Sequence, residues 1–483
     1  MKISNNWLKD FIKTELKTER IGEFLTDIGL EVEGIEKFES IKGSLEGIVV
    51  GKVVTCEKHP NADKLKKTTV DVGNGKILNI VCGAPNVEAG QTVPVAVVGT
   101  KIYDKSGSFF EIKEAKIRGE VSQGMICAED ELGLSDDHGG IMVLDEEKFE
   151  VGKNFADYFE ITNDEVLEIG LTPNRTDAMS HYGVARDLYA YLSTNKQKSD
   201  FEKVSSVVLS NEGTHDFKLV VEDAELCPRY IGAVIEDVKV AESPAWLKDR
   251  LKAIGLSPIN NVVDITNYIL HGFGQPLHAF DADKISGGLS IKRAGSAEKF
   301  TTLDGQERTL HADDLMVWDD VKPLALAGTM GGLESEITET TTRIAVEAVR
   351  FNPVAIAKNS RRHKLSSEAS RRLERSVDPS LAEFSSARFV QLLTELSTAK
   401  HVETVFDGEP RFAPVVKVDP DYVASVLGIE ITPAEIAGHL RSVGCDVDEK
   451  TFEVDPPSWR SDLLQQADFV EEVARMVGYD KIP

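Results

Sequence analysis

The chain has 483 residues, of which 41% are hydrophobic and 28% are charged, and its formal net charge at pH 7 is −26. This composition excludes the disordered, collagen-like and membrane-spanning classes, and the length predicts several domains. So acidic a chain is a poor general binder of nucleic acid, and any such function requires a local basic patch. The N-terminus lacks the apolar core of a secretion signal, which predicts a cytoplasmic protein with no membrane partner.

The cysteines argue against a disulfide framework and against a thiolate zinc site. There are five of them, widely scattered and without a CxxC spacing. An odd number of isolated cysteines in a cytoplasmic chain is typical of reduced thiols that fill small apolar niches.

The residue pattern, and with it the expected secondary structure, changes several times along the chain. Residues 1–42 carry two apolar helical stripes followed by a short alternating strand, and helical periodicity returns near residue 181. Between them, short β-rich runs alternate with Gly, Pro and Asn turns, which is typical of a small β-barrel. Three further regions follow: a polar linker at 193–212, a mixed α and β region at 213–400, and a compact helix-rich region at 415–480.

An internal repeat relates the two ends of the chain. IGEFLTDIGLEVE at 21–33 matches IAGHLRSVGCDVD at 436–448, and PNRTD at 173–177 matches PSWRSD at 457–462. The repeat predicts that 1–42 and 153–195 form one domain into which the barrel is inserted, and that the C-terminal region is a second copy without an insert.

Four acidic residues crowd the end of the chain: Asp462, Asp468, Glu471 and Glu472. The last three are spaced i, i+3, i+4, so on a helix they share one face, where like charges repel by about 0.2–0.5 kcal/mol per pair. Grouped carboxylates suit a hard cation such as Mg²⁺. The alternative is structural: Asp468 and Glu471 form a helix capping box, or the acids form a solvated helix face.

Basic residues gather in two segments of the barrel region: Lys64, Lys66, Lys113, Lys116 and Arg118. Barrels of this kind often bind oligonucleotides on one face. Aromatic residues are sparse here, which favours contact with phosphates and with RNA shape over base stacking. The alternative interpretation is a solvated lysine face.

The middle region contains two polar clusters. INNVVDITNYILHGFGQPLHAFDADKI at 259–285 includes Thr266 and His278, and a glycine-rich stretch follows at 326–338. A histidine is the usual proton-transfer group near neutral pH, although a lone histidine is more often structural. Glycines there offer close approach of the backbone to a ligand.

Four motifs of the barrel region are similar to the tRNA-binding barrel of several tRNA-handling proteins: KHPNADKL, VDVGNG, IVCGAPNV and KIRGEVSQGMICAEDELGL. Together with RSDLLQQADFVEEVARMVGYDKIP at the end, the whole chain resembles the β subunits of bacterial phenylalanine–tRNA ligases. Family members continue into synthetase-like and anticodon-binding domains, so the chain resembles an N-terminal fragment. The resemblance implies a multidomain α+β fold: a split N-terminal helical domain (1–42 plus 153–195), an inserted OB-fold tRNA-binding β-barrel (43–152), a mixed α/β editing domain of the B3/B4 type (210–400), and a helix-rich, winged-helix-like domain of the B5 type (410–483).

The resemblance also implies partners and a cofactor. An α subunit binds ATP and attaches phenylalanine, the assembly is an α2β2 tetramer, and tRNA(Phe) is the substrate. The family's Mg²⁺-associated acids match Asp462, Asp468, Glu471 and Glu472, in a site shared with the α subunit. The fragment alone is not expected to aminoacylate, and no DNA partner is expected.

The β subunits of this family also hydrolyse mischarged Tyr-tRNA(Phe). The resemblance places this editing pocket at Thr266, His278, Ser367 and Ala369. Where many relatives have Glu after the double glycine, this chain has Leu333, and Glu334 one place later is expected to accept the tyrosine hydroxyl. The alternative is a non-enzymatic tRNA-binding scaffold with a degenerate editing site.

Overall fold

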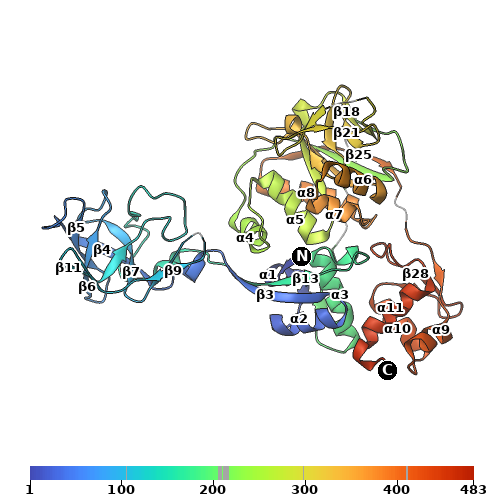
Figure 1. The fold of residues 1–483 in the computed structure, drawn as a ribbon, viewed down its shortest axis with the longest axis horizontal. Coiled ribbons are helices and arrows are strands. Elements are labelled where there is room, and N and C mark those ends of the chain that lie inside the picture. The colour runs from blue at the N-terminus through green and yellow to red at the C-terminus, as the bar shows by residue number, and fades with distance from the viewer. Residues whose placement is uncertain (105, 205–208, 210–216, 297–298, 410–411) are drawn as a thin grey trace. The chain divides into compact units, whose positions relative to one another are not determined.

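The computed structural model describes residues 1–104, 106–204, 209, 217–296, 299–409 and 412–483. The chain divides into a barrel unit, Lys37–Asp164, and a main unit made of Met1–Glu36 with Glu165–Pro483 (Figure 1). The main unit mixes α-helices and strands, whereas the barrel unit consists of strands with two short 3-10 turns, so the multidomain α and β class is as predicted. The first residues predicted for the third and fourth domains, 210 and 410, lie outside the described residues. In the described chain, no helix combines the length and the apolar composition needed to cross a membrane.

The barrel unit is built on one nearly closed antiparallel sheet. Its strands lie in the order β12-β7-β4-β5-β6. Hydrogen bonds from Val81 N to Ser122 Oγ (3.1 Å) and from Gln123 N to Asn79 O (2.7 Å) join the two edges of the sheet. The strands of the unit are β4 (Ile48–Lys58), β5 (Lys66–Asp71), β6 (Ile77–Cys82), β7 (Thr92–Val97), β8 (Lys101–Tyr103), β9 (Phe109–Glu111), β10 (Ala115–Ile117), β11 (Glu120–Ser122) and β12 (Gly124–Ile126), with short 3-10 turns at Lys42–Leu45 and Phe155–Tyr158.

The two segments related by the sequence repeat have the same sheet topology in the main unit. Each copy has a three-stranded sheet with the strand that comes last in the chain at its centre, β1-β13-β3 and β26-β28-β27. The first copy comprises β1 (Lys2–Ser4), α1 (Asn5–Leu8), α2 (Thr18–Asp27), β3 (Glu31–Glu39), β13 (Asn163–Gly170) and α3 (His181–Thr194), and the second comprises β26 (Val416–Lys417), α9 (Pro420–Leu427), α10 (Pro433–Ser442), β27 (Asp446–Val447), β28 (Glu453–Asp455) and α11 (Gln466–Val477).

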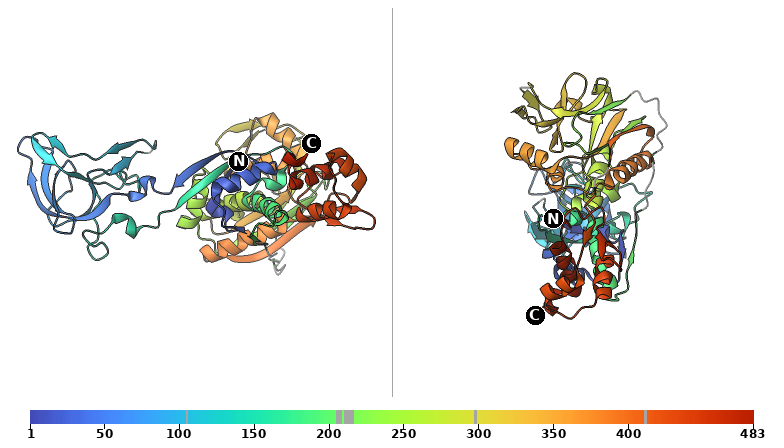
Figure 2. Two further views of the ribbon diagram at one scale, coloured as in Figure 1. Left: turned by 90° about the horizontal axis from the view of Figure 1, so that it is seen from below. Right: turned by 90° about the vertical axis from the view of Figure 1, so that its right-hand side faces the viewer.

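The matching sequence positions explain why the two copies fold alike. Helices α2 and α10 bury the equivalent residues Leu25 and Leu440. Each helix is followed by a glycine in the left-handed region, Gly29 with φ +86° and Gly444 with φ +96°, a conformation that side chains rarely adopt. In the second copy, α9, α10 and α11 pack together at the C-terminal end of the ribbon (Figure 2).

Two sheets stacked face to face form the centre of the remaining part. A four-stranded sheet has the order β17-β24-β16-β25, and a five-stranded sheet has the order β15-β18-β21-β22-β23. These strands are β15 (Lys218–Val221), β16 (Arg229–Glu236), β17 (Leu277–Asp281), β18 (Gly288–Arg293), β21 (Leu315–Trp318), β22 (Pro323–Leu326), β23 (Met330–Gly331), β24 (Ile344–Arg350) and β25 (Lys400–Gly408).

Helices cover the outer face of the four-stranded sheet. α5 (Asn261–Phe273) and α8 (Leu381–Leu396) pack on it and against each other. Alternate residues of β24 therefore face in opposite directions: Val346 joins the helix-side core, and Ala345 joins the core shared with the second sheet. The remaining elements are α4 (Ala245–Ala253), α6 (Pro353–His363), α7 (Glu368–Leu373), the paired strands β2 (Ile12–Lys13) with β14 (Asp200–Phe201) and β19 (Lys299–Thr301) with β20 (Glu307–Thr309), and 3-10 turns at Thr176–Ala178, Ala282–Lys284, Leu333–Ser335 and Tyr479–Lys481.

The five cysteines are free thiols, as predicted. Four of them are buried. Burial raises the pKa of Cys82 and keeps that thiol protonated.

Candidate functional site

A cavity of about 80 Å³ lies between the two stacked sheets. This volume is several times the roughly 15 Å³ that one water molecule needs. Strands β17 and β24 form one wall, and β22 with the glycine-rich turn that follows forms another. The lining residues are Pro276, Leu277, His278, Ala325, Leu326, Gly328, Thr329, Met330, Gly331, Glu347, Val349, Phe351, Ala369 and Leu373. The cavity is mainly apolar with a few polar groups, which is the usual composition of a small-molecule site.

Strand pairing brings the two titratable lining residues together. His278 on β17 is directly opposite Glu347 on β24 in the antiparallel register. Directly opposite residues point to the same face of a sheet, with their Cβ atoms about 4.5–5.5 Å apart. Both side chains therefore face the cavity rather than the helices.

Glu347 is a buried carboxyl group that contacts a phenol. Glu347 is 5% exposed, and its Oε2 accepts a hydrogen bond of 2.5 Å from the hydroxyl of Tyr230. Burial raises the pKa of Glu347 to about 7, against the hydrogen bond from Tyr230, which lowers it. No arginine or lysine lowers this pKa, so near pH 7 the charged and neutral forms of the carboxyl group are about equally populated.

His278 is a neutral imidazole at physiological pH. Burial lowers its pKa to about 4. The Gly331 backbone lies against its ring: a Cβ at that glycine would be 2.4 Å from His278 Cε1. The absence of a side chain at position 331 thus leaves room for the imidazole at the cavity wall.

The structure brings some of the predicted editing residues together and separates others. His278 and Ala369 line the cavity. Ser367 caps α7, where its hydroxyl accepts from Ser370 N (3.1 Å) and donates to the carbonyl of Thr329 (2.9 Å), so it holds the helix against the cavity turn. Thr266 does not line the cavity: its hydroxyl donates to Val263 O (2.7 Å) within α5.

The expectation for Glu334 is corrected. This carboxylate lies in the 3-10 turn Leu333–Ser335, its side chain is 75% exposed, and it pairs with Lys322 at 2.8 Å. The carboxyl group that lines the cavity is Glu347, in the middle of the apolar strand IAVEAVR. The signal in the sequence is a charged residue in the middle of an apolar strand, because such a residue is rarely buried without a role.

The C-terminal acids belong to a second buried polar cluster, which we call the arginine network. Arg175 pairs with Asp177 through Nε (3.0 Å) and Nη2 (3.1 Å), and Arg460 pairs with Asp462 in the same way (2.8 and 2.9 Å). The Arg-x-Asp pairs are equivalent in the two copies of the repeat. Both pairs use the two-point geometry that suits a guanidinium and a carboxylate.

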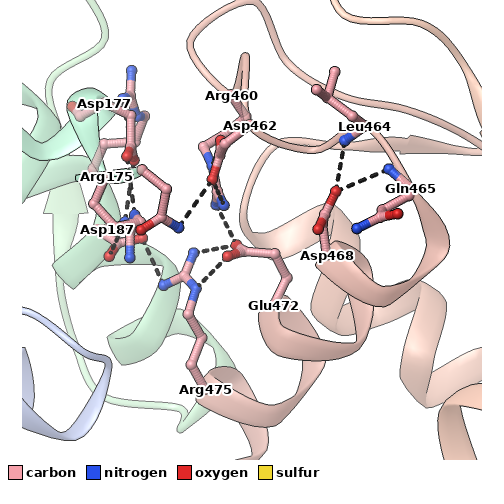
Figure 3. A network of polar contacts seen from close by, with 12 residues as sticks. Arg175, Asp177, Asp187, Arg460, Asp462, Leu464, Gln465, Asp468, Glu472 and Arg475 are labelled. Carbon is pink, nitrogen blue, oxygen red and sulfur yellow. Dashed lines mark hydrogen bonds and ion pairs between the residues drawn. The ribbon is translucent and has the colours of Figure 1, made fainter. Parts of the chain in front are cut away.

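Further contacts join these pairs into one chain of alternating charges (Figure 3). Asp187 accepts from both Arg175 and Arg475 at 2.8 Å. Glu472 accepts from Arg475 Nε at 2.8 Å and lies 2.5 Å from Arg460 Nη1. Burial alone would raise the pKa of Glu472, but the guanidiniums of Arg475 and Arg460 outweigh it and hold the pKa well below its usual range.

The four acids do not fit a common metal site in this chain. Glu472 is 1% exposed and faces two guanidiniums, while Glu471, its neighbour in the sequence, is exposed. Asp468 turns back along α11, where its Oδ2 accepts from Leu464 N (2.8 Å) and Gln465 N (2.9 Å), as in helix capping. Across the described ranges, no group of three or more His, Cys, Asp and Glu side chains is placed to hold a metal ion.

The predicted basic residues of the barrel unit are mostly on its surface. Lys64, Lys116 and Arg118 are exposed. The loop before Lys64 and the β10–β11 hairpin are adjacent, because His59 Nε2 lies 3.1 Å from Ile117 O and Asn61 Nδ2 donates to Arg118 O (3.3 Å).

The other two predicted lysines have different surroundings. Lys113 lines a hollow of about 650 Å³ on the barrel unit. Lys66 is half-buried and donates to the carbonyls of Pro85 (3.1 Å) and Val87 (2.7 Å). Its ammonium group is therefore already engaged by the protein.

Three domain families match separate parts of the chain. Residues 48–154 match the family described as putative tRNA binding domain. Residues 226–398 match the B3/4 domain, and residues 416–479 match the tRNA synthetase B5 domain. The cavity lies within the B3/4 match, and Arg460, Asp462, Glu472 and Arg475 lie within the B5 match.

The whole chain also aligns with curated relatives. It is 44% identical over 490 residues to the phenylalanine–tRNA ligase beta subunit of Bacteroides fragilis, and 43% identical over 492 residues to that of Porphyromonas gingivalis, with 100% of this chain covered. A solved N-terminal fragment of the phenylalanyl-tRNA synthetase beta-subunit from Pyrococcus horikoshii aligns with 65% of this chain and 87% of that one, at 16% identity and a TM-score of 0.34, which is too low to establish a shared fold. The chain spans 59% of the length of the two curated relatives. Over its whole length the chain is therefore similar in sequence to phenylalanine–tRNA ligase beta subunits, and three domain families match successive parts of it.

Proposed function

We propose that this chain is the part of a phenylalanine–tRNA ligase beta subunit that binds tRNA(Phe) and hydrolyses mischarged Tyr-tRNA(Phe). In this proposal an α subunit carries the ATP-dependent attachment of phenylalanine in a cytoplasmic α2β2 assembly, and this chain does not aminoacylate by itself. The observation that carries the proposal is a cavity in the B3/4 region with Glu347 and His278 side by side on neighbouring strands.

The cavity walls suit an aromatic ring, and Glu347 suits its hydroxyl group. Val349, Phe351 and Leu373 provide apolar contact, and Glu347 provides a buried acceptor. A buried acceptor that a ligand leaves unpaired costs several kilocalories per mole, so a hydrogen-bonding pocket can separate tyrosine from phenylalanine by roughly 10⁴-fold or more. An apolar pocket alone separates such ligands only by about 10- to 200-fold. This site therefore favours tyrosine over phenylalanine.

Hydrolysis in this cavity proceeds by direct attack of water on the ester. The only hydroxyl side chain lining it within the described chain is Thr329, and that hydroxyl donates to the carbonyl of Ala327 (3.3 Å). No serine or cysteine nucleophile is available there, so a covalent intermediate is not expected. His278, which is neutral at physiological pH, can orient the water through a ring nitrogen.

The barrel unit supplies the tRNA contacts of this proposal. Exposed Lys64, Lys116 and Arg118 come from adjacent segments, which gives a local positive surface in an acidic chain. Such contacts are with phosphates, and they weaken as salt rises. A Mg²⁺ site shared with an α subunit stays a prediction from the resemblance. No step of the proposal passes through a metal ion, because Glu472 and Asp468 are already engaged within this chain.

The deacylation of Tyr-tRNA(Phe) by the chain tests the proposal. We expect release of tyrosine well above the uncatalysed rate, and a fall of at least about 100-fold in Glu347→Gln, because a neutral amide that also carries N–H donors replaces the charged acceptor of the tyrosine hydroxyl. His278→Ala should also deacylate Tyr-tRNA(Phe) more slowly than the wild type. The matched control is Glu334→Gln, which removes an exposed carboxylate of the same domain and should leave the rate unchanged.

Two results would contradict the proposal. Rates near the uncatalysed value in the wild type and in all variants, with tRNA binding intact, would favour the non-enzymatic scaffold. Loss of activity in Glu334→Gln but not in Glu347→Gln would move the site away from the cavity.

A further inference from the structure

Tyr230 is the residue behind the cavity that contacts Glu347. It lies on β16, next to β24, and it is 0% exposed. Its hydroxyl donates to Glu347 Oε2 at 2.5 Å, and it is not itself among the lining residues. A contact of this kind acts on a ligand only through Glu347.

The strand register explains how the phenol ring reaches the carboxyl group. Gly232 is directly opposite Glu347 in the pairing of β16 with β24. A Cβ at Gly232 would be 3.5 Å from Tyr230 Cε1 and 3.1 Å from Val405 Cγ2. A longer side chain at this position would press on the ring, so the glycine leaves the space that Tyr230 uses.

The two oxygens of Glu347 therefore have different surroundings. Oε2 accepts from Tyr230. Within the described chain, Oε1 accepts no hydrogen bond, and the residue lines the cavity. A carboxylate can accept several hydrogen bonds, so Oε1 remains able to accept one from a ligand.

We propose that Tyr230 is a positioning residue that sets the hydroxyl selectivity of the cavity: by holding Glu347 through Oε2, it keeps Oε1 as an acceptor for the phenol of a bound tyrosyl group. This inference rests on the proposed function, because it assigns the ligand class of the same cavity. It adds a residue whose own side chain never touches the ligand.

A second consequence concerns the protonation of Glu347. Burial raises its pKa to about 7, and the donation from Tyr230 lowers it, so removal of the hydroxyl raises the pKa further. A protonated carboxyl group is a weaker acceptor. The other titratable groups facing it are His278 from β17 and the thiol of Cys227, which precedes β16. The lining residues from β22, the glycine-rich turn and α7 carry no titratable side chain.

The test is the binding of L-tyrosine and of L-phenylalanine to the chain by calorimetry between pH 6 and pH 9. The ratio of the two affinities cancels the titration of their similar amino groups. In the wild type we expect the preference for tyrosine to rise with pH, with a midpoint near 7. In Tyr230→Phe the midpoint should move up by roughly one pH unit, and the preference at pH 7 should fall by about fivefold, while phenylalanine binding stays unchanged.

Two further samples separate positioning from a general structural effect. Tyr268→Phe removes another buried phenol, outside the cavity, and should leave the midpoint unchanged. The chain with its tyrosines replaced by 3-fluorotyrosine has more acidic phenols, so the midpoint should move down. That sample keeps every ring in place, and it tests the inference even where Tyr230→Phe does not fold.

The possible failures are distinguishable. A wild type that binds both amino acids equally at every pH contradicts the proposed function itself. A wild type that prefers tyrosine, with the same midpoint in Tyr230→Phe and in the fluorotyrosine chain, leaves the proposed function standing and overturns the role of Tyr230.

Discussion

Two buried carboxyl groups of the main unit, Glu347 in the cavity and Glu472 in the arginine network, are 5% and 1% exposed and have opposite surroundings. Glu347 contacts a phenol, and burial raises its pKa to about 7. Glu472 lies between Arg460 and Arg475, which hold its pKa well below the usual range. Burial is nearly the same for both residues, so the neighbouring charges decide the difference.

This difference separates a group available to a ligand from a group that holds the fold together. A carboxylate between two guanidiniums has its lone pairs occupied and gains nothing from a further partner. A carboxyl group without a cation is costly to bury, and such a cost is typical of functional sites. The network joins the two copies of the repeat, and the cavity lies between two sheets, away from that junction.

Breaking the arginine network should have the largest effect. Glu472→Gln leaves Arg460 and Arg475 without their shared charge, and loss of one partner from a buried ion pair costs about 3–5 kcal/mol. The measurement is urea unfolding of the chain followed by circular dichroism. Glu471→Gln, the exposed neighbour, should change stability by less than about 0.5 kcal/mol. Equal effects of the two variants would remove the distinction between them.

Glu347 should instead oppose folding at neutral pH. Its pKa rises from an ordinary 4.5 to about 7 in the folded chain. Between these values the unfolded chain releases the proton and the folded chain keeps it, so stability falls as pH rises, by about 3 kcal/mol in total, and no further above pH 7.

The midpoints of unfolding at pH 4.5 and pH 8 measure this loss of stability. The decline should be smaller in Glu347→Gln than in the wild type, and it should persist in Glu334→Gln. An identical decline in all three chains would show that Glu347 keeps its ordinary pKa.

Filling the cavity should weaken binding without removing the fold. The Cβ of Gly331→Ala would lie 2.4 Å from His278 Cε1, so the imidazole must move into the cavity. Overpacking of this kind costs about 1–3 kcal/mol, which predicts roughly 10- to 100-fold weaker binding of L-tyrosine. Gly438→Ala meets nothing within 4 Å and is the matched control. Unchanged tyrosine binding in Gly331→Ala would place the ligand elsewhere.

The smallest expected effect is at the edge of the network. The Arg186 guanidinium lies 4.1 Å from the centre of the Trp459 ring, which joins the two copies of the repeat. Such a cation–π contact contributes about 0.5–2 kcal/mol. Trp459→Leu should therefore lower the unfolding midpoint less than Glu472→Gln does, and the reverse order would show that the ring, rather than the ion pairs, holds the copies together.

The parts of the fold that follow from repeated sequence patterns could be predicted. The contacts between segments distant in the sequence could not. Equivalent glycines and leucines showed that the two ends of the chain fold alike. His278 and Ala369 could be placed through the resemblance, and both line the cavity. Glu334 was predicted because it follows the position after the double glycine at which many relatives have Glu, whereas strand pairing brings Glu347 to His278.

The contacts of the acidic cluster could not be predicted for a related reason. The spacing of Asp468, Glu471 and Glu472 describes one helix only. The partners of Glu472 are Arg475 on the same helix and Arg460 from the preceding loop, and Asp187 of the first copy joins the same network. Charge compensation from segments far apart in the sequence becomes visible only after the two copies are packed together.

Difference infrared spectroscopy of the carboxyl groups tests the central contrast most directly. The wild-type spectrum minus that of Glu347→Gln should show a protonated carboxyl band that disappears with a midpoint near pH 7. The same subtraction with Glu472→Gln should show no protonated band between pH 5 and pH 9. A Glu347 band that is lost near pH 4.5, or a protonated Glu472 at neutral pH, would contradict the account.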